Sequence, residues 1–146
     1  MSKKMNSPNI NQPQELNLIR MAILPKSLMI IVGISGCFSV LFGAWLAHGG
    51  QTLPVGVQSS LATALQYQFI HTLALLATLL WLKTVKSSKV LLSASIAFAV
   101  GLLCFCGTIY IKSFFELAII GKLTPFGGIS FAFAWILLAL EGKNNF

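Results

Sequence analysis

The sequence is poor in acidic residues. Its 146 residues include no aspartate, and the acidic residues are Glu15, Glu116 and Glu141. Charged residues of both signs make up 9% of the chain and hydrophobic residues 56%, whereas a soluble domain carries about 25% charged residues. This composition excludes an ordinary water-soluble fold. The scarcity of carboxylates also removes most chemistry that depends on them, such as paired-carboxylate glycoside cleavage and oxygen-rich magnesium or calcium sites.

Cysteine and histidine are also scarce, and their positions argue against a bound metal or cofactor. Cys37, Cys104 and Cys106 are odd in number, lie in apolar segments and lack CxxC spacing, so neither a disulfide framework nor a zinc site is expected. Bis-histidine haem ligation needs both rings at one depth, but His48 ends the first apolar run and His71 lies near the middle of the second. We therefore expect no metal and no cofactor.

Long apolar runs are what the sequence has in abundance. Four of them, at about residues 27–48, 61–82, 90–111 and 124–140, are long enough or nearly long enough to cross a bilayer, for which a helix needs about 20 residues. Because lipid cannot hydrogen-bond an exposed backbone, such runs must be helical. The sequence predicts an all-α, multi-pass integral membrane protein whose residues 27–143 form a four-helix transmembrane bundle.

The segment before the first run has a different composition. Residues 1–26 are rich in asparagine, glutamine, proline and serine, and such a segment buries too little surface to offset chain entropy. A secretory signal peptide is the competing interpretation, but the apolar run that follows is longer than a signal-peptide core and has no A-x-A cleavage pattern. We expect a cytoplasmic, largely disordered N-terminal segment followed by an uncleaved first span.

The net charge of +7 indicates membrane topology. The basic residues lie in short clusters between apolar runs and leave no solvated basic face, so nucleic acid is not an expected partner. Two of the ten, Lys112 and Lys122, fall on one side of the predicted bundle. The other eight fall on the opposite side and are Lys3, Lys4, Arg20, Lys26, Lys83, Lys86, Lys89 and Lys143. By the positive-inside rule, both termini are expected to be cytoplasmic.

Small residues recur at helical spacing in the first and third runs. Ser39, Gly43 and Ala47 follow one another at intervals of four residues, and Gly101 ends a similar series with Ser93 and Ala97. Faces of this kind let helix backbones approach closely in lipid. They are suited either to packing within the bundle or to a homodimer contact.

The second run carries a polar stripe. Ser60, Thr63, Tyr67, His71 and Thr78 fall on one face of a helix, and polar groups at membrane depth are costly without partners. We expect this stripe to face the bundle interior. His71 is either a functional ionisable group or a neutral histidine that hydrogen-bonds a neighbouring helix.

Four short motifs occur together in a fixed order. They are Gly43–His48 (GAWLAH), Tyr67–Ala74 (YQFIHTLA), Phe105–Tyr110 (FCGTIY) and Thr124–Gly128 (TPFGG). On these motifs the chain, over roughly residues 28–140, resembles the YgdD-like family of small multi-pass inner-membrane proteins of unknown function. The resemblance implies a four-helix protein of the bacterial inner membrane and supplies no established reaction.

The motif residues divide into two groups. Gly43, Ala47, Gly107, Thr124, Pro125, Gly127 and Gly128 make sense as packing positions, with Thr124 and Pro125 suited to starting a helix. The remaining candidates, His48, Tyr67, Gln68 and His71, are harder to explain as packing alone. They are the candidate residues of a binding site or polar core.

Two functions remain open at this point. The small size, short loops and lack of a catalytic constellation favour a structural or accessory membrane component that is not an enzyme. The alternative is a transporter or channel for a small solute or a proton that uses the polar face of the second span. The expected partner is the lipid bilayer, with a homo-oligomer or a larger membrane complex as further candidates.

Overall fold

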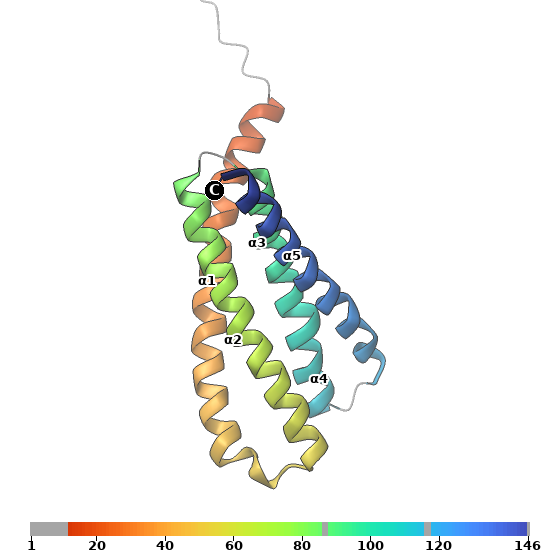
Figure 1. Cartoon of the computed structure of the whole chain (residues 1–146). Helices are drawn as coiled ribbons and strands as arrows, with labels where there is room; N and C mark the ends of the chain where they lie inside the picture. Colours follow the sequence, from red (N-terminus) through yellow and green to blue (C-terminus); the bar gives the residue numbers. More distant parts are fainter. Residues whose placement is uncertain (1–11, 86–87, 116–117, 146) are drawn as a thin grey trace, which may run out of the picture.

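All regular structure in the described part of the chain is helical. The computed structural model describes residues 12–85, 88–115 and 118–145, with side chains from residue 23 onward and none at 118, 119 and 145. The helices are α1 (Gln12–His48), η1 (Gly50–Thr52), α2 (Val55–Thr84), α3 (Lys89–Gly101), the π-helical η2 (Leu102–Gly107), α4 (Thr108–Phe115), the 3-10 helix η3 (Ala118–Leu123) and α5 (Thr124–Asn145). Segments α3, η2 and α4 follow one another without a break as a third long helix (Figure 1).

Four helices are long and apolar enough to cross a membrane, which confirms the predicted fold class. They cover Ile23–His48, Val55–Thr84, Lys89–Phe115 and Ile120–Asn144. The start of the first helix differs from the expectation, because α1 is already helical from Gln12, inside the segment expected to be largely disordered. Pro13 occupies its first turn, where a missing N–H costs nothing, and good helix formers follow. Residues 1–11 lie outside the described part.

The third helix is the centre of the arrangement. Helices α1 and α2 form an antiparallel hairpin through η1, and α5 packs along α3 and η2 (Figure 1). In the most apolar stretch of the third helix, half of the residues are buried, compared with 17% in the corresponding stretches of the first and last spans. The start of α1 and the end of α5 lie at one end of the bundle, as an even number of spans requires. That this end faces the cytoplasm stays a prediction.

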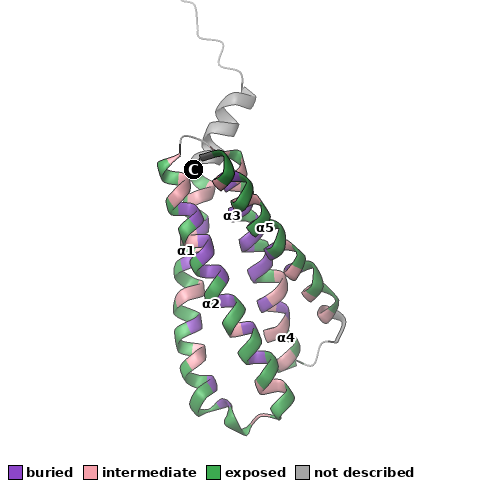
Figure 2. Ribbon diagram, viewed as in Figure 1, coloured by how far each residue is buried: buried purple, intermediate pink, exposed green. Residues whose placement is uncertain are grey.

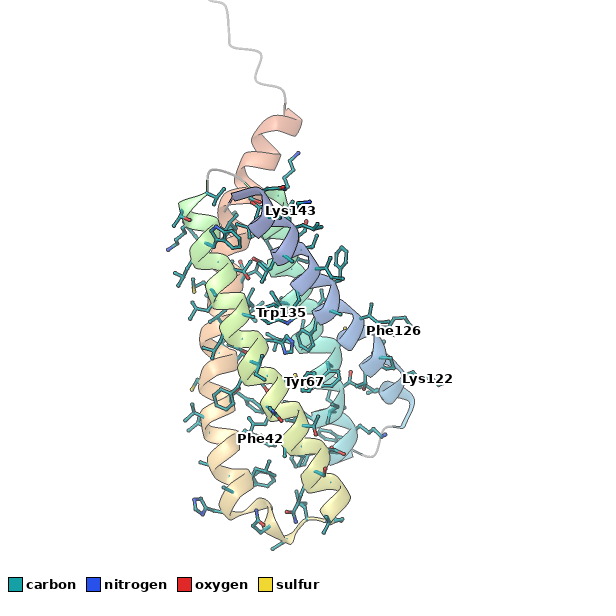
Figure 3. All side chains as sticks on the ribbon, viewed as in Figure 1. Phe42, Tyr67, Lys122, Phe126, Trp135 and Lys143 are labelled. Atoms are coloured by element: carbon teal, nitrogen blue, oxygen red, sulfur yellow. The ribbon has the colours of Figure 1, made fainter. Side chains whose placement is uncertain are left out.

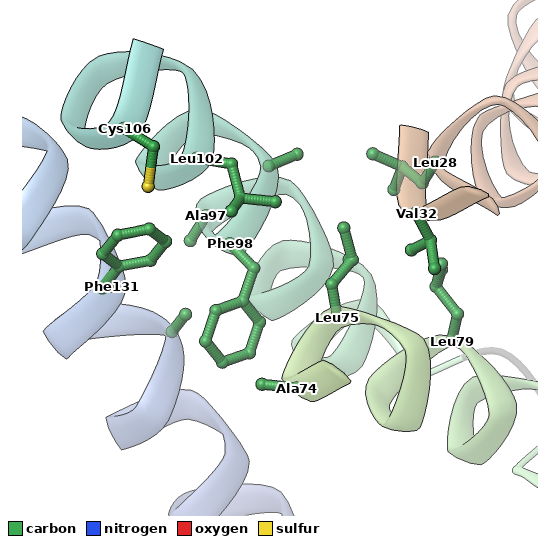
Figure 4. Close-up of a cluster of buried hydrophobic side chains, with 12 residues drawn as sticks. Leu28, Val32, Ala74, Leu75, Leu79, Ala97, Phe98, Leu102, Cys106 and Phe131 are labelled. Carbon is green, nitrogen blue, oxygen red and sulfur yellow. The ribbon is translucent and has the colours of Figure 1, made fainter. Parts of the chain in front are cut away.

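The core is a band of aliphatic and aromatic side chains where α2, α3 and α5 meet. Leu75 and Phe98 are fully buried, and Leu102, Phe131 and Ala134 are buried around them (Figure 4). Outside this core, most side chains along each helix are exposed or half-buried (Figure 2). Lipid is as apolar as these side chains, so close packing, and not exclusion from water, must hold the helices together.

Two glycines allow α5 to approach the third helix closely. A Cβ atom built on Gly127 would collide with the backbone nitrogen of Phe105 and lie 2.7 Å from the carbonyl carbon of Cys104. A Cβ on Gly101 would likewise overlap the ring of Phe131. Neither position has room for any side chain. On α1, Ser39 is fully buried, and a Cβ on Gly43 would come within 3.3 Å of Leu65.

Other predicted packing positions are not tight. A Cβ on Gly107 would meet nothing closer than 4.0 Å, and one on Gly128 would make ordinary contact with the Phe105 ring at 3.9 Å. Ala47 is exposed. Packing at Gly107 and Gly128 is looser than at Gly127, and Ala47 borders a cavity between α1 and the start of α2, so the packing role of Gly107 and Ala47 stays a prediction. Helix α5 does begin at Thr124 with Pro125 in its first turn.

The glycine pair at the start of α5 provides a matched test. Gly127→Ala should lower the free energy of unfolding by about 1–3 kcal/mol, because the methyl group overlaps backbone that cannot move aside. Gly128→Ala, one residue later, should be nearly neutral. Thermal unfolding of both variants in one mild detergent measures the difference. Equal stabilities would contradict the close approach of α5 to Phe105.

Candidate functional site

A glutamine amide connects three helices at mid-membrane. Gln68 lies in the middle of α2 and is 7% exposed. Its Nε2 donates to the backbone carbonyl of Ser35 on α1 at 3.2 Å and to the Ser35 hydroxyl at 3.0 Å. Its Oε1 accepts a hydrogen bond from the Tyr110 hydroxyl on α4 at 2.7 Å. Both ends of the amide are therefore used between helices.

Small hydroxyl side chains complete this network. The hydroxyls of Ser35 and Thr72 lie 2.7 Å apart, and Ser39 donates to the Ser35 carbonyl at 2.8 Å. Each participant thus has a partner in the protein, as groups shielded from water require. Across the described residues, no buried side-chain nitrogen or oxygen lacks a hydrogen bond. We call Ser35, Ser39, Gln68, Thr72 and Tyr110 the Gln68 network.

His71 lies one turn of α2 further on, with a different set of neighbours. It is 6% exposed, and its Nδ1 lies 2.7 Å from the backbone carbonyl of Tyr67. A carbonyl only accepts, so Nδ1 carries the proton in this contact, and Nε2 of the neutral ring is the acceptor. The hydrogen bond is local to α2 and joins no second helix.

Aromatic rings connect His71 to α5. The imidazole stacks on the Phe131 ring, with centroids 3.6 Å apart and planes 17° from parallel. Tyr67 stacks on Phe105 of η2 at 4.7 Å, and Phe98 meets Trp135 edge-on at 5.5 Å. Figure 3 shows Tyr67 and Trp135 on the two helices that this layer joins. The imidazole thus serves as a flat ring packed between helices.

Beyond this aromatic layer, α2 and α5 diverge (Figure 1). Residues of both helices line a cavity of about 670 Å³ there. The first turns of α2 and α5 line it together with Phe105, Ile109 and Lys112 of the third helix and Gly121 of η3. Ser59, Ser60, Thr63, Ser113 and Thr124 give its wall a polar character. A second cavity of about 420 Å³ lies where α1 meets the start of α2, beside Gly43 and Ala47.

The predicted site residues do not form one site. Gln68 faces α1 and α4, whereas Tyr67 and His71 face η2 and α5, so the structure separates neighbours in sequence into two clusters. His48 is exposed at the end of α1 and joins neither cluster. The predicted stripe does face neighbouring helices but is buried only in part. His71 and Thr78 are buried. Ser60 and Thr63 are exposed but line the cavity, and Tyr67 is 40% exposed while it stacks on Phe105.

Sequence analysis missed the main partner of Gln68. Tyr110 is one of only two tyrosines in the chain and sits in an otherwise apolar run, which is a signal for a polar contact at membrane depth. The cavity gives no signal in the sequence. Among the residues that the structure describes, no group of three His, Cys, Asp or Glu side chains could hold a metal ion.

Comparison with known proteins gives a consistent result. Residues 42–128 match the family described as protein of unknown function (DUF423). The chain is 35% identical over 112 residues to the "UPF0382 membrane protein" of Haemophilus influenzae, with 76% of this chain and 89% of that protein covered. It is 28% identical over 116 residues to the "UPF0382 membrane protein YwdK" of Bacillus subtilis, with 79% and 94% covered.

The resemblance seen in the four motifs is thereby confirmed. The "UPF0382 inner membrane protein YgdD" of Escherichia coli is 31% identical over 114 residues, with 77% of this chain and 86% of that protein covered. No solved structure matches. The name of the Escherichia coli relative agrees with four membrane-spanning helices in placing this chain in the inner membrane. The chain belongs to the DUF423 family, and the relatives named above are UPF0382 membrane proteins.

Proposed function

We propose that this protein is a structural or accessory component of the inner membrane and that it is not an enzyme. The observation that carries the proposal is the use made of Gln68. This amide is buried, and both of its ends bond neighbouring helices. A polar group that binds a substrate needs a free donor or acceptor. The polar groups of the Gln68 network instead hydrogen-bond one another and so hold α1, α2 and α4 together.

The transporter alternative gains nothing from these contacts or from the relatives. A path along α2 would need Ser60, Thr63, Tyr67 and His71 to line one continuous interior channel. Ser60 and Thr63 instead bond carbonyls of their own helix, and the ring of Phe131 covers His71. Among the described residues, these polar side chains of α2 therefore form no continuous interior line.

An accessory role needs a surface for a partner, and α1 supplies a candidate. Gly33, Cys37, Val40 and Ala44 are exposed along one side of this helix. Neither Gly33 nor the adjacent Gly36 has any atom within 4 Å of a Cβ built on it. Small residues of this kind allow another membrane helix to approach closely. The partner in this proposal is a second copy of the chain or a helix of a larger membrane complex.

Replacing Gln68 tests the network. Gln68→Leu should lower the free energy of unfolding by about 1–2 kcal/mol, since it breaks the contacts to both α1 and α4, and hydrogen bonds between membrane helices are individually weak. Gln66→Leu, an exposed position on the same helix, is the matched control and should change stability little. Thermal unfolding in mild detergent measures both. If Gln66→Leu were as damaging as Gln68→Leu, the network would not be a stabilising element.

The accessory role is tested by assembly. From membranes solubilised in mild detergent, the tagged wild-type protein should bring down a defined partner, or a second untagged copy, in a fixed ratio. Gly36→Leu should reduce that recovery at least fivefold, because the larger side chain blocks the open face of α1. Ala132→Leu makes the same kind of change on the exposed side of α5 and should leave the recovery unchanged.

Two results would count against this role. One is recovery of the tagged protein by itself under conditions that preserve a known membrane complex. The other is equal recovery of the partner with Gly36→Leu and with Ala132→Leu.

A further inference from the structure

The cavity between α2, α4, η3 and α5 has features that the proposed structural role does not use. It encloses about 670 Å³, within the range of about 300–1,000 Å³ that small-ligand sites occupy. Its lining includes residues from the first turns of α2 and α5, and these turns lie away from the bundle end that holds the C-terminus of α5 (Figure 1). Its depth is therefore that of the membrane surface, where lipid headgroups lie.

The charge in this cavity is positive. Among the described residues, Lys112 is the one charged residue that lines it. The Lys112 ammonium lies 3.7 Å from the position of a Cβ built on Gly121, which is an ordinary contact distance. The first turns of α2 and α5 also border the cavity, and the N-terminal end of a helix carries partial positive charge. Glu116, four residues after Lys112 in the sequence, lies outside the described residues. The described lining is suited to an anion.

The remaining wall is divided between acceptors and apolar surface. The hydroxyls of Ser60 and Thr63 donate to carbonyls of α2 at 2.9 and 3.0 Å, which leaves their oxygen atoms free to accept hydrogen bonds. Phe105 and Ile109 form the apolar side. Phe105 belongs to the π-helical segment η2, and such segments in a helix occur frequently at functional sites.

We propose that this cavity binds the headgroup of an anionic phospholipid. Lys112 meets the phosphate, the oxygens of Ser60 and Thr63 accept hydrogen bonds from headgroup hydroxyls, and the first part of an acyl chain lies against Phe105 and Ile109. A phospholipid is favoured over a soluble phosphate because the cavity combines one cation with an apolar wall at the membrane surface, and lipid reaches it from the side without crossing water. The proposal stands on the cavity and does not depend on the structural role of the Gln68 network.

Native mass spectrometry of the full chain in detergent, titrated with phosphatidylglycerol or phosphatidylcholine, tests the proposal. Wild type should retain one phosphatidylglycerol at concentrations where phosphatidylcholine is lost. Lys112→Gln should weaken that binding about tenfold, because it removes a charge-assisted contact. Lys122→Gln removes an exposed lysine that does not line the cavity; Figure 3 labels it beside the start of α5. This matched control should change binding less than twofold.

Two further variants separate the site from general charge effects. Ser60→Phe fills the cavity from an exposed position whose hydroxyl bonds only its own helix, so it should abolish specific binding while thermal stability is kept. Glu116→Gln should leave phosphatidylglycerol binding equal or stronger. Equal losses in the two lysine variants, equal binding of both lipids, or unchanged binding in Ser60→Phe would each overturn the proposal. Displacement of the lipid by millimolar glycerol phosphate would also overturn it and identify a soluble phosphate as the occupant.

Discussion

The fold depends on one constraint: polar groups at membrane depth have no water to hydrogen-bond and must find partners within the protein. Gln68 meets this constraint by bonding Ser35 on one side and Tyr110 on the other, so a single amide sets the relation of three helices. The aliphatic core around Leu75 and Phe98 could pack in several ways in lipid, where burial by itself gives little preference. The hydrogen bonds favour the observed packing, because in the described residues it leaves no buried side-chain nitrogen or oxygen without a partner.

Close approach of backbones provides the second selection. At Gly127 the backbone of α5 lies against that of Phe105, and at Gly101 the third helix receives the ring of Phe131. The same ring stacks on His71. One phenylalanine thus fits a space left by a glycine on one helix and covers an imidazole on another. Packing and polar contacts are coupled at this point, and beyond it α2 and α5 diverge to leave the larger cavity.

The sequence was sufficient for the four spans because their signal is simple: each run is apolar and long enough to cross lipid. It was insufficient for the site, because a contact between helices depends on how each helix is rotated about its axis and on which helix lies beside it. Gly107 and Gly127 look alike in a motif, yet a Cβ on Gly107 would meet nothing closer than 4.0 Å, whereas one on Gly127 would collide with the backbone of Phe105. Tyr67 and Gln68 are adjacent, yet they face different helices. The helical start of α1, which continues through Pro25, was not predicted either, because the composition of residues 1–26 suggested a largely disordered segment.

The π-helical segment Leu102–Gly107 sets the rotation of α4 relative to α3. A π segment holds one more residue than an α-helix would over the same turn, and each residue of an α-helix turns the chain by about 100°. If the same residues followed regular α geometry, the extra one would rotate all of α4 relative to α3. Tyr110 would then turn away from Gln68, and Lys112 would leave the cavity, although every side chain in both clusters remained unchanged. The wide turn therefore keeps the Gln68 network and the cavity in register with the core residues of α3, and loss of one residue within it would leave α4 facing the same neighbours.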